Sequence, residues 1–284
     1  MKLFRILIPV LLVSGWIMTS CDKLDPPYAT VLTQYDTTNK PYILLEEYTG
    51  HTCNNCPLAT QKALRLIDYY RTKVILMTVH ATSLADPNPK YPLDLRTPEG
   101  TLWAGDYSIS GVPAGTINRT AIGGSIAVPS DKWGEAIETQ ISKPIAAMVQ
   151  LSASYSSSTR EISASVSGWF KKKLTAGSNI CLFITEDSIE GKQSNKDTAA
   201  GPTPEIDPYY FNETFRGSMN GNYGSLFSAT VEVDKLYTYT KTFPVTNTDW
   251  NTNRLYLIAA ILDPSASQFG EIIAVTKARI VSTK

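Results

Sequence analysis

Residues 42–57, YILLEEYTGHTCNNCP, decide the fold prediction for the first part of the chain. The first seven of them predict a buried strand. A short loop follows and ends at the pair Cys53 and Cys56. Residues 57–70 carry apolar side chains at helical spacing, so we predict a helix that begins beside the second cysteine.

These two cysteines carry the chemistry that the sequence offers. On a first helical turn, residues three apart lie close enough to form a disulfide with little rearrangement. The unpaired N–H groups of that turn stabilise a thiolate on Cys53, and a thiolate is the attacking species in disulfide exchange. We therefore predict Cys53 as the nucleophile and Cys56 as the resolving thiol. A structural or vestigial disulfide without exchange activity is the alternative.

Two histidines, His51 and His80, are expected at the same sheet edge as the cysteines. They either tune the thiols through hydrogen bonds or join the cysteines in holding copper(I) or zinc. We favour tuning, and so predict no metal and no cofactor. Covalent haem attachment of the Cys-x-x-Cys-His type is excluded because Pro57 follows Cys56.

Residues 73–143 continue with alternating strands and helices. A nearly continuous apolar run over 73–80 predicts a second buried strand. Thr97 followed by a proline predicts a helix start. The loop over 86–92 is either a lip over the cysteines or a surface insertion. The remaining predicted elements are strands over 115–118 and near residue 126, and a helix over 131–141.

Beyond residue 144 the hydrophobic period changes to two, which predicts a second, all-β part built as a sandwich. Cys181 stands in a continuous apolar strand, where a free cysteine behaves as a small hydrophobic residue. Residues 192–225, rich in Gly, Asn, Pro and Tyr, are predicted to form a long ordered loop.

The start of the chain predicts export. Lys2 and Arg5 precede a short apolar run, and small residues lead to Cys21. This pattern is typical of a secretory signal and is too short for a membrane-spanning helix. It also resembles a bacterial lipobox, which implies a lipid on Cys21. We therefore predict a signal peptide over 1–20 and a lipidated tether over 21–39.

Composition adds limits on function and stabilisation. The chain holds 26 basic and 26 acidic residues. This balance gives no indication of nucleic-acid binding, which calls for a clustered basic face. Four cysteines, with one assigned to lipid and one isolated, exclude a fold braced by several disulfides.

Residues 42–119 resemble the thioredoxin superfamily in the order of elements, the CxxC pair and the dipeptide Val112-Pro113. The resemblance implies a cis peptide bond before Pro113, beside the cysteines. It also implies that Glu47 is buried and takes up the proton of Cys56, while Glu46 points to the opposite face. The superfamily's tryptophan before the first cysteine and its Gly-Pro dipeptide are replaced here, which leaves the direction of redox action open.

Most of residues 40–284 resembles a narrower group, the Omp-twenty-eight-related outer-membrane lipoproteins of Bacteroides-type bacteria. The resemblance is carried by residues 45–50 with the CNNCP motif, by 185–187 with Gln193, and by Phe215-Arg216-Gly217. It implies a protein anchored at the outer membrane.

Together these patterns predict an α/β thioredoxin-like domain over 40–143 followed by an all-β, immunoglobulin-like sandwich domain over 144–284. The predicted function is thiol–disulfide exchange with envelope proteins by Cys53 and Cys56, assisted by Glu47, Val112 and Pro113. The alternative is a non-catalytic surface binding or assembly lipoprotein. The predicted partners are the membrane, through the lipid on Cys21, and an unidentified envelope protein. Substrate, leaflet and oligomeric state stay open.

Overall fold

The computed structural model describes residues 39–283, in which the chain forms fifteen strands, three α-helices and two short 3₁₀ helices. The signal peptide, Cys21 and most of the predicted tether lie outside the described residues. In chain order the elements are β1 (Ile43–Thr49), α1 (Cys56–Tyr69), β2 (Val74–His80), η1 (Ser83–Ala85), α2 (Pro98–Asp106), β3 (Ala114–Ile117), β4 (Val128–Pro129), α3 (Trp133–Ile141), β5 (Ala147–Ser156), β6 (Glu161–Phe170), β7 (Ser178–Glu186), β8 (Ile189–Ser194), β9 (Glu205–Phe211), β10 (Thr214–Ser218), β11 (Ser225–Ser228), β12 (Leu236–Pro244), η2 (Thr252–Arg254), β13 (Leu255–Asp263), β14 (Glu271–Arg279) and β15 (Val281–Thr283).

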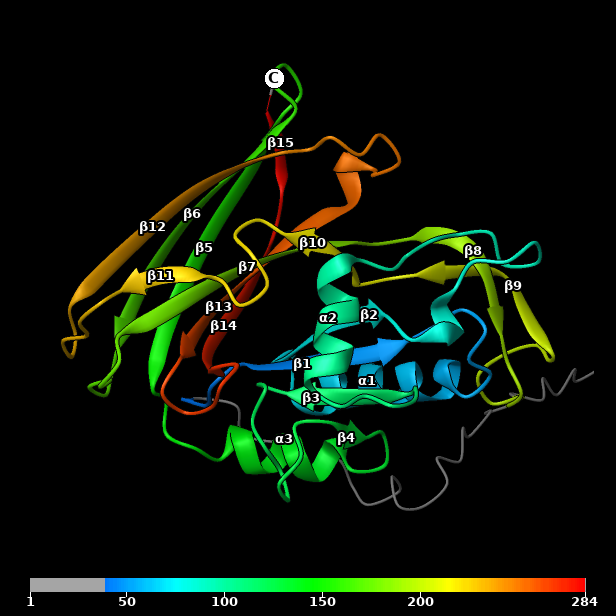
Figure 1. Ribbon diagram of the computed structural model, residues 1–284, viewed down its shortest axis with the longest axis horizontal. Helices are drawn as coiled ribbons and strands as arrows, with labels where there is room; N and C mark the ends of the chain where they lie inside the picture. Colours follow the sequence, from blue (N-terminus) through cyan, green and yellow to red (C-terminus); the bar gives the residue numbers. More distant parts are fainter. Residues whose placement is uncertain (1–38, 284) are drawn as a thin grey trace, which may run out of the picture. The chain divides into compact units, whose positions relative to one another are not determined.

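A nine-stranded sheet runs through the described chain in the order β14-β13-β7-β10-β2-β1-β3-β4, with β11 added beside β7. Strand β1 is parallel to β2 and antiparallel to β3. Strand β10 joins the two parts of the sheet, because it pairs in parallel with β2 and antiparallel with β7. Strands from early and late in the sequence therefore share one sheet (Figure 1).

Helices cover the early strands on both faces. Helices α1 and α3 bury the face of β1 that carries Ile43 and Leu45. Helix α2 covers the other face (Figure 1). Trp103 of α2 and Leu44 of β1 belong to the same apolar core on that face. Because side chains alternate along a strand, Glu46 and Glu47 lie on opposite faces, as predicted.

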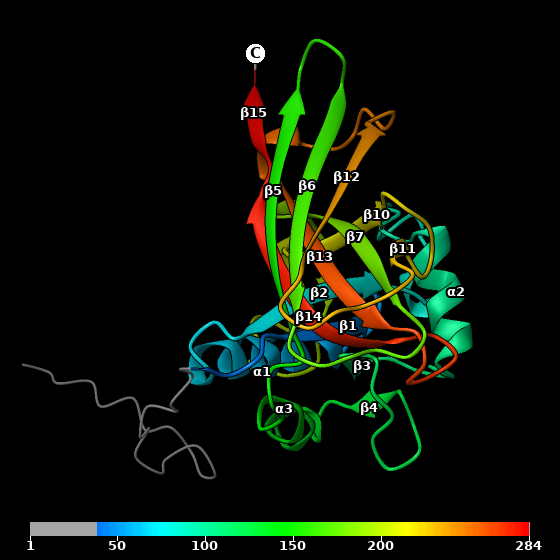
Figure 2. The ribbon, with the colours of Figure 1, turned by 90° about the vertical axis from the view of Figure 1, so that its left-hand side faces the viewer.

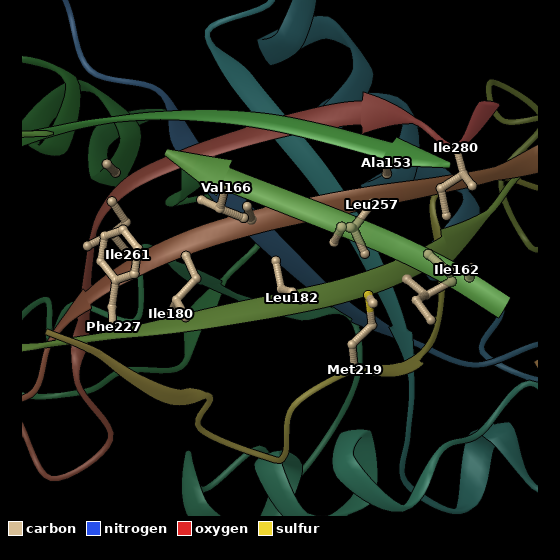
Figure 3. Close-up of a cluster of buried hydrophobic side chains, with 14 of the residues drawn as sticks. Ala153, Ile162, Val166, Ile180, Leu182, Met219, Phe227, Leu257, Ile261 and Ile280 are labelled. Carbon is tan, nitrogen blue, oxygen red and sulfur yellow. The ribbon is translucent and has the colours of Figure 1, made fainter. Parts of the chain in front are cut away.

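A second sheet, in the order β12-β6-β5-β15, packs across β7, β13 and β14 (Figure 2). Its inward side chains, such as Ile162 and Val166 of β6, meet Leu182 of β7 and Leu257 of β13 in an apolar core (Figure 3). This second layer gives the late part of the chain its sandwich character.

The predicted fold class, an α/β thioredoxin-like domain followed by an immunoglobulin-like sandwich domain, is wrong. The described chain is mostly strand, and β7 and β13 each serve two cores. Leu182 of β7 faces the sandwich core, while Phe183 packs on the α2 side with Trp103. The late strands thus extend the early sheet. The predicted boundary at 143 and 144 stays a prediction.

The predicted long loop over 192–225 is also wrong. Part of β8, strands β9 and β10 and the first residue of β11 lie in that range, and β8 and β9 form an antiparallel hairpin. The cis proline Pro204 directly precedes β9 and the cis proline Pro208 lies within it. Prolines are uncommon in strands, so the segment does not carry the usual sequence signature of one. Cys181 is buried and free, as predicted. Among residues 39–283, no helix is long and apolar enough to cross a membrane.

Candidate functional site

Cys53 and Cys56 form a disulfide at the start of α1. The loop before it is fixed by backbone hydrogen bonds, from Cys53 N–H to the Gly50 carbonyl (3.0 Å) and from Thr52 N–H to the Leu84 carbonyl (3.1 Å). A Cβ atom on Gly50 would lie 2.4 Å from the Leu84 oxygen, so only glycine fits this close approach of two backbones. The disulfide therefore stands on a tightly held loop.

The dipeptide Val112-Pro113 lies beside the disulfide, and its peptide bond is cis. The sulfur of Cys53 is 3.6 Å from the Val112 carbonyl oxygen. The cysteine pair and the Val112-Pro113 dipeptide, which the resemblance placed side by side, are therefore neighbours in the structure.

Glu47 is completely buried on the α1 side of the sheet. Its Oε1 accepts a 2.8 Å hydrogen bond from the Thr60 hydroxyl, and its Oε2 has no partner. Burial disfavours the charged form and raises the pKa of Glu47 to about 8. The Thr60 hydroxyl also lies 3.2 Å from the Cys56 carbonyl oxygen. Thr60 of α1 therefore lies between the Glu47 carboxyl group and the backbone of Cys56.

Glu46 makes a buried ion pair with Arg119. Arg119 Nη2 donates to Glu46 Oε1 at 2.6 Å, and both side chains have no exposed surface. The Arg119 guanidinium lies 4.6 Å from the centre of the Trp103 ring. Arg119 stands in a turn just beyond β3 with a left-handed φ of 54°, and no sequence signal marks it as the partner of Glu46.

The two histidines lie near the loop but in different surroundings. The His51 ring is 3.1 Å from the Asp86 carbonyl oxygen and stacks on Tyr91 of the 86–92 loop. Burial lowers the pKa of His51. His80 is fully buried against Phe211, neither ring nitrogen has a hydrogen-bond partner, and burial lowers its pKa to about 3. Among the described residues, no cluster of three or more His, Cys, Asp or Glu side chains is arranged to hold a metal ion.

The β8–β9 hairpin covers the disulfide loop. Ser194 N–H donates to the His51 carbonyl (2.9 Å), and Lys196 N–H donates to the Asn54 carbonyl (3.0 Å). The Gln193 side-chain amide donates to the carbonyls of Cys53 (2.9 Å) and Gly50 (3.2 Å). Cys53 and Cys56 keep only 3% and 1% of their surface exposed. The only trace of this cover in the sequence is Gln193 among the residues that carry the family resemblance.

Phe215 and Arg216, which also carry the resemblance to the outer-membrane lipoproteins, lie away from the disulfide. Arg216 Nε is 3.2 Å from a carboxylate oxygen of Glu186, and Phe215 packs in the α2-side core. In the 86–92 loop, Lys90 forms a 2.9 Å ion pair with Glu205 of β9. This loop therefore packs against His51 and the hairpin.

A cavity of about 230 Å³ lies beside Cys56, between α1, β2 and the hairpin. Its walls are mainly apolar and aromatic, and His80 and Thr60 line it as well. The lining residues are Thr49, Cys56, Pro57, Thr60, Gln61, Leu64, Leu76, Thr78, His80, Gln193, Ala200, Tyr209, Tyr210, Phe211, Asn212 and Glu213.

Comparison with known proteins places this architecture in a family. HBP35 of Porphyromonas gingivalis has a similar structure, with a TM-score of 0.64 and 15% sequence identity over 85% of this chain and 76% of that chain. This likeness shows a shared fold. Protein AGR_C_4864 from Agrobacterium tumefaciens matches with a TM-score of 0.48 and 11% identity over 85% of this chain and 96% of that chain. No curated protein matches the sequence.

The family profile described as outer membrane protein Omp28 matches residues 103–284, which is more than half of the chain. The match includes the strands of the sandwich, the β8–β9 hairpin and the Val112-Pro113 dipeptide. It supports a location at the outer membrane or elsewhere in the cell envelope. The chain belongs to the Omp28 outer membrane protein family.

Proposed function

We propose that this envelope protein exchanges disulfides with thiols of other envelope proteins through Cys53 and Cys56. The observation that carries the proposal is the placement of a disulfide at a helix start, beside the cis Val112-Pro113 bond, with Glu47 buried nearby. A carboxyl group with a pKa of about 8 is mostly protonated at neutral pH, so it can give a proton to a leaving thiolate.

In the first step a partner thiolate attacks Cys53 Sγ. A bond forms between the partner sulfur and Cys53, the Cys53–Cys56 bond breaks, and the electron pair leaves with Cys56. The Glu47 carboxyl group then supplies a proton to the Cys56 thiolate. A second partner thiolate attacks the mixed disulfide, releasing an oxidised partner and the Cys53 thiolate, so the electrons balance.

The β8–β9 hairpin limits access to the disulfide. A protein thiol reaches Cys53 only when the hydrogen bonds of Ser194, Gln193 and Lys196 to the loop open. We therefore propose that exchange is gated by the hairpin, with reduction slower than that of an exposed disulfide.

The test is to trap the mixed disulfide. In a Cys56→Ser variant the free Cys53 thiolate can attack a partner disulfide, which forms the same mixed disulfide from the reverse direction, and Cys56 is no longer present to resolve it. Cys53 is therefore expected to retain partners in complexes that run apart only after reduction. The matched control is Cys53→Ser, which keeps one free thiol but should trap nothing. If both variants trap the same proteins, or neither traps any, exchange through Cys53 is excluded.

The second candidate is a non-catalytic binding or assembly protein with a structural disulfide. The burial of both sulfurs under the hairpin favours it. This candidate predicts a reduction potential below about −300 mV in a glutathione series. It also predicts that the double variant Cys53→Ser with Cys56→Ser still captures its partner.

We also propose that a lipid on Cys21 anchors the protein to the membrane. The sequence before Cys21 supports this, since a short apolar run ends in small residues at that cysteine. Mass spectrometry of the mature N-terminal peptide should find a diacylated cysteine. Cys21→Ser should release the protein from the membrane fraction, and its retention there would contradict the proposal.

A further inference from the structure

The cavity beside Cys56 is partly open and combines a largely apolar wall with an unpaired polar group. His80 is 1% exposed, and both of its ring nitrogens lack a hydrogen-bond partner. Buried polar groups in folded proteins are nearly always hydrogen-bonded, and an unpaired one costs about 1–3 kcal/mol. Because His80 lines the cavity, an occupant of the cavity is placed to supply the missing partner.

The walls indicate what kind of occupant fits. Phe211 packs edge-on against His80 at 5.2 Å between ring centres, and Tyr209 packs on Phe211 at 4.8 Å. Pro57 and Leu76 add aliphatic surface. Aromatic rings favour stacked or edge-to-face contact with another ring, which gains energy beyond the area buried.

The charges near the cavity exclude an ionic occupant. His80 is neutral at pH 7, because burial lowers its pKa to about 3. The Glu213 carboxylate is already paired with Lys277. An ion in the cavity would therefore lose its hydration without gaining a free counter-charge from the described lining residues, which is unfavourable.

The volume limits the size. A cavity of about 150 Å³ suffices for benzene, and drug-sized ligands occupy roughly 300–1,000 Å³. About 230 Å³ lies between these values and suits one or two fused rings.

We propose that this cavity binds a neutral aromatic group with one ring N–H or hydroxyl, which hydrogen-bonds to His80. The group is either a free small molecule or the side chain of a partner protein. Because the cavity touches Cys56, a bound side chain would also hold a partner next to the disulfide. The site itself does not depend on exchange activity.

The test uses the oxidised full chain, with indole and N-acetyltryptophanamide as probes. We expect saturable calorimetric binding of indole with a Kd of about 1 mM or tighter. The chain holds two histidines, so imidazole NMR resolves the site directly. The His80 resonances should shift with indole, while those of His51 stay in place as an internal reference.

Two variants decide whether the cavity holds the probe. Ala200→Trp places a large side chain on a lining residue and should abolish binding. Ala199→Trp is the matched control, because Ala199 is exposed and outside the lining, and it should leave binding unchanged. His80→Phe keeps the ring but removes the hydrogen bond, so indole should lose about tenfold in affinity.

Binding of the tryptophan amide as well as indole would identify a side chain as an acceptable source. Binding of indole alone would identify a free small molecule. The proposal is overturned if neither probe binds, or if indole binds equally well to Ala200→Trp and Ala199→Trp. These results do not depend on mixed-disulfide trapping, so failure of the two proposals can be told apart.

Discussion

Replacing Glu46 by glutamine should destabilise the protein more than any exposed charge change. Glu46 accepts hydrogen bonds from Arg119 at 2.6 Å and about 3 Å, and neither side chain is exposed. Glu46→Gln leaves the Arg119 guanidinium buried among Trp103, Tyr107 and Phe183 without a counter-charge. This pair lies where the early strands meet the α2-side core.

Removing one partner of a buried ion pair costs roughly 3–5 kcal/mol. With a urea dependence of about 2 kcal/mol per M, a loss of about 4 kcal/mol lowers the unfolding midpoint by about 2 M. The double variant Glu46→Leu with Arg119→Met replaces both charges by apolar groups of similar size, so it should lie within about 1 kcal/mol of the parent or above it. The two sites should therefore couple by several kcal/mol.

The measurement is equilibrium unfolding in urea followed by tryptophan fluorescence. The matched control is Glu135→Gln, because Glu135 forms an exposed ion pair with Lys132 at 3.3 Å and should cost less than about 1 kcal/mol. The reasoning is refuted if Glu46→Gln costs no more than Glu135→Gln. It is equally refuted if the free energy of unfolding lost in the double variant equals the sum of the losses in the single variants Glu46→Leu and Arg119→Met.

Three further outcomes are expected. Glu47 loses its proton near pH 4.5 in the unfolded chain and near pH 8 in the folded protein. The free energy of unfolding should therefore fall by a few kcal/mol as the pH rises between these values. In urea unfolding midpoints measured across pH, Glu47→Gln should remove that fall. His80 gives the opposite pH dependence, because its imidazole binds a proton below about pH 6.5 in the unfolded chain but only near pH 3 in the folded protein. The free energy of unfolding should therefore fall as the pH is lowered through this window, and His80→Phe should remove that fall. Gln193→Ala removes the side-chain hydrogen bonds to the Cys53 and Gly50 carbonyls, so dithiothreitol should reduce the disulfide faster than in the parent protein. The rate is measured by quenching samples at intervals and counting free thiols. An unchanged rate would show that the hairpin does not limit access to the disulfide.

Local features of the fold could be predicted because short-range patterns specify them. The apolar run of β1 and the helix after Cys56 follow from spacing alone, whereas the buried position of Glu47 could be inferred only from the resemblance. The cis bond at Val112-Pro113 could be inferred only from the resemblance, since a prolyl bond carries no local mark of its isomer.

Long-range features could not be predicted. Residues 180–184 are apolar at every position, so the sequence does not reveal that alternate side chains enter two different cores. The prolines of the β8–β9 hairpin obscure its strand pattern, so the hairpin could not be predicted from the sequence. No residue near Arg119 in the sequence indicates that it pairs with Glu46, 73 residues earlier. These features depend on contacts between distant segments, which periodicity cannot report.

The joint between β2 and β10 has a consequence for the order of folding. Thr78 of β2 donates its N–H to the Glu213 carbonyl and its hydroxyl to the Asn212 carbonyl, 134 residues later in the chain. Until that segment has been synthesised, the edge of β2 has no strand beside it. The early sheet is then open to pairing with another chain. Contacts of such sequence separation also slow folding, so the edge of β2 stays unpaired until the second half of the chain has folded against it.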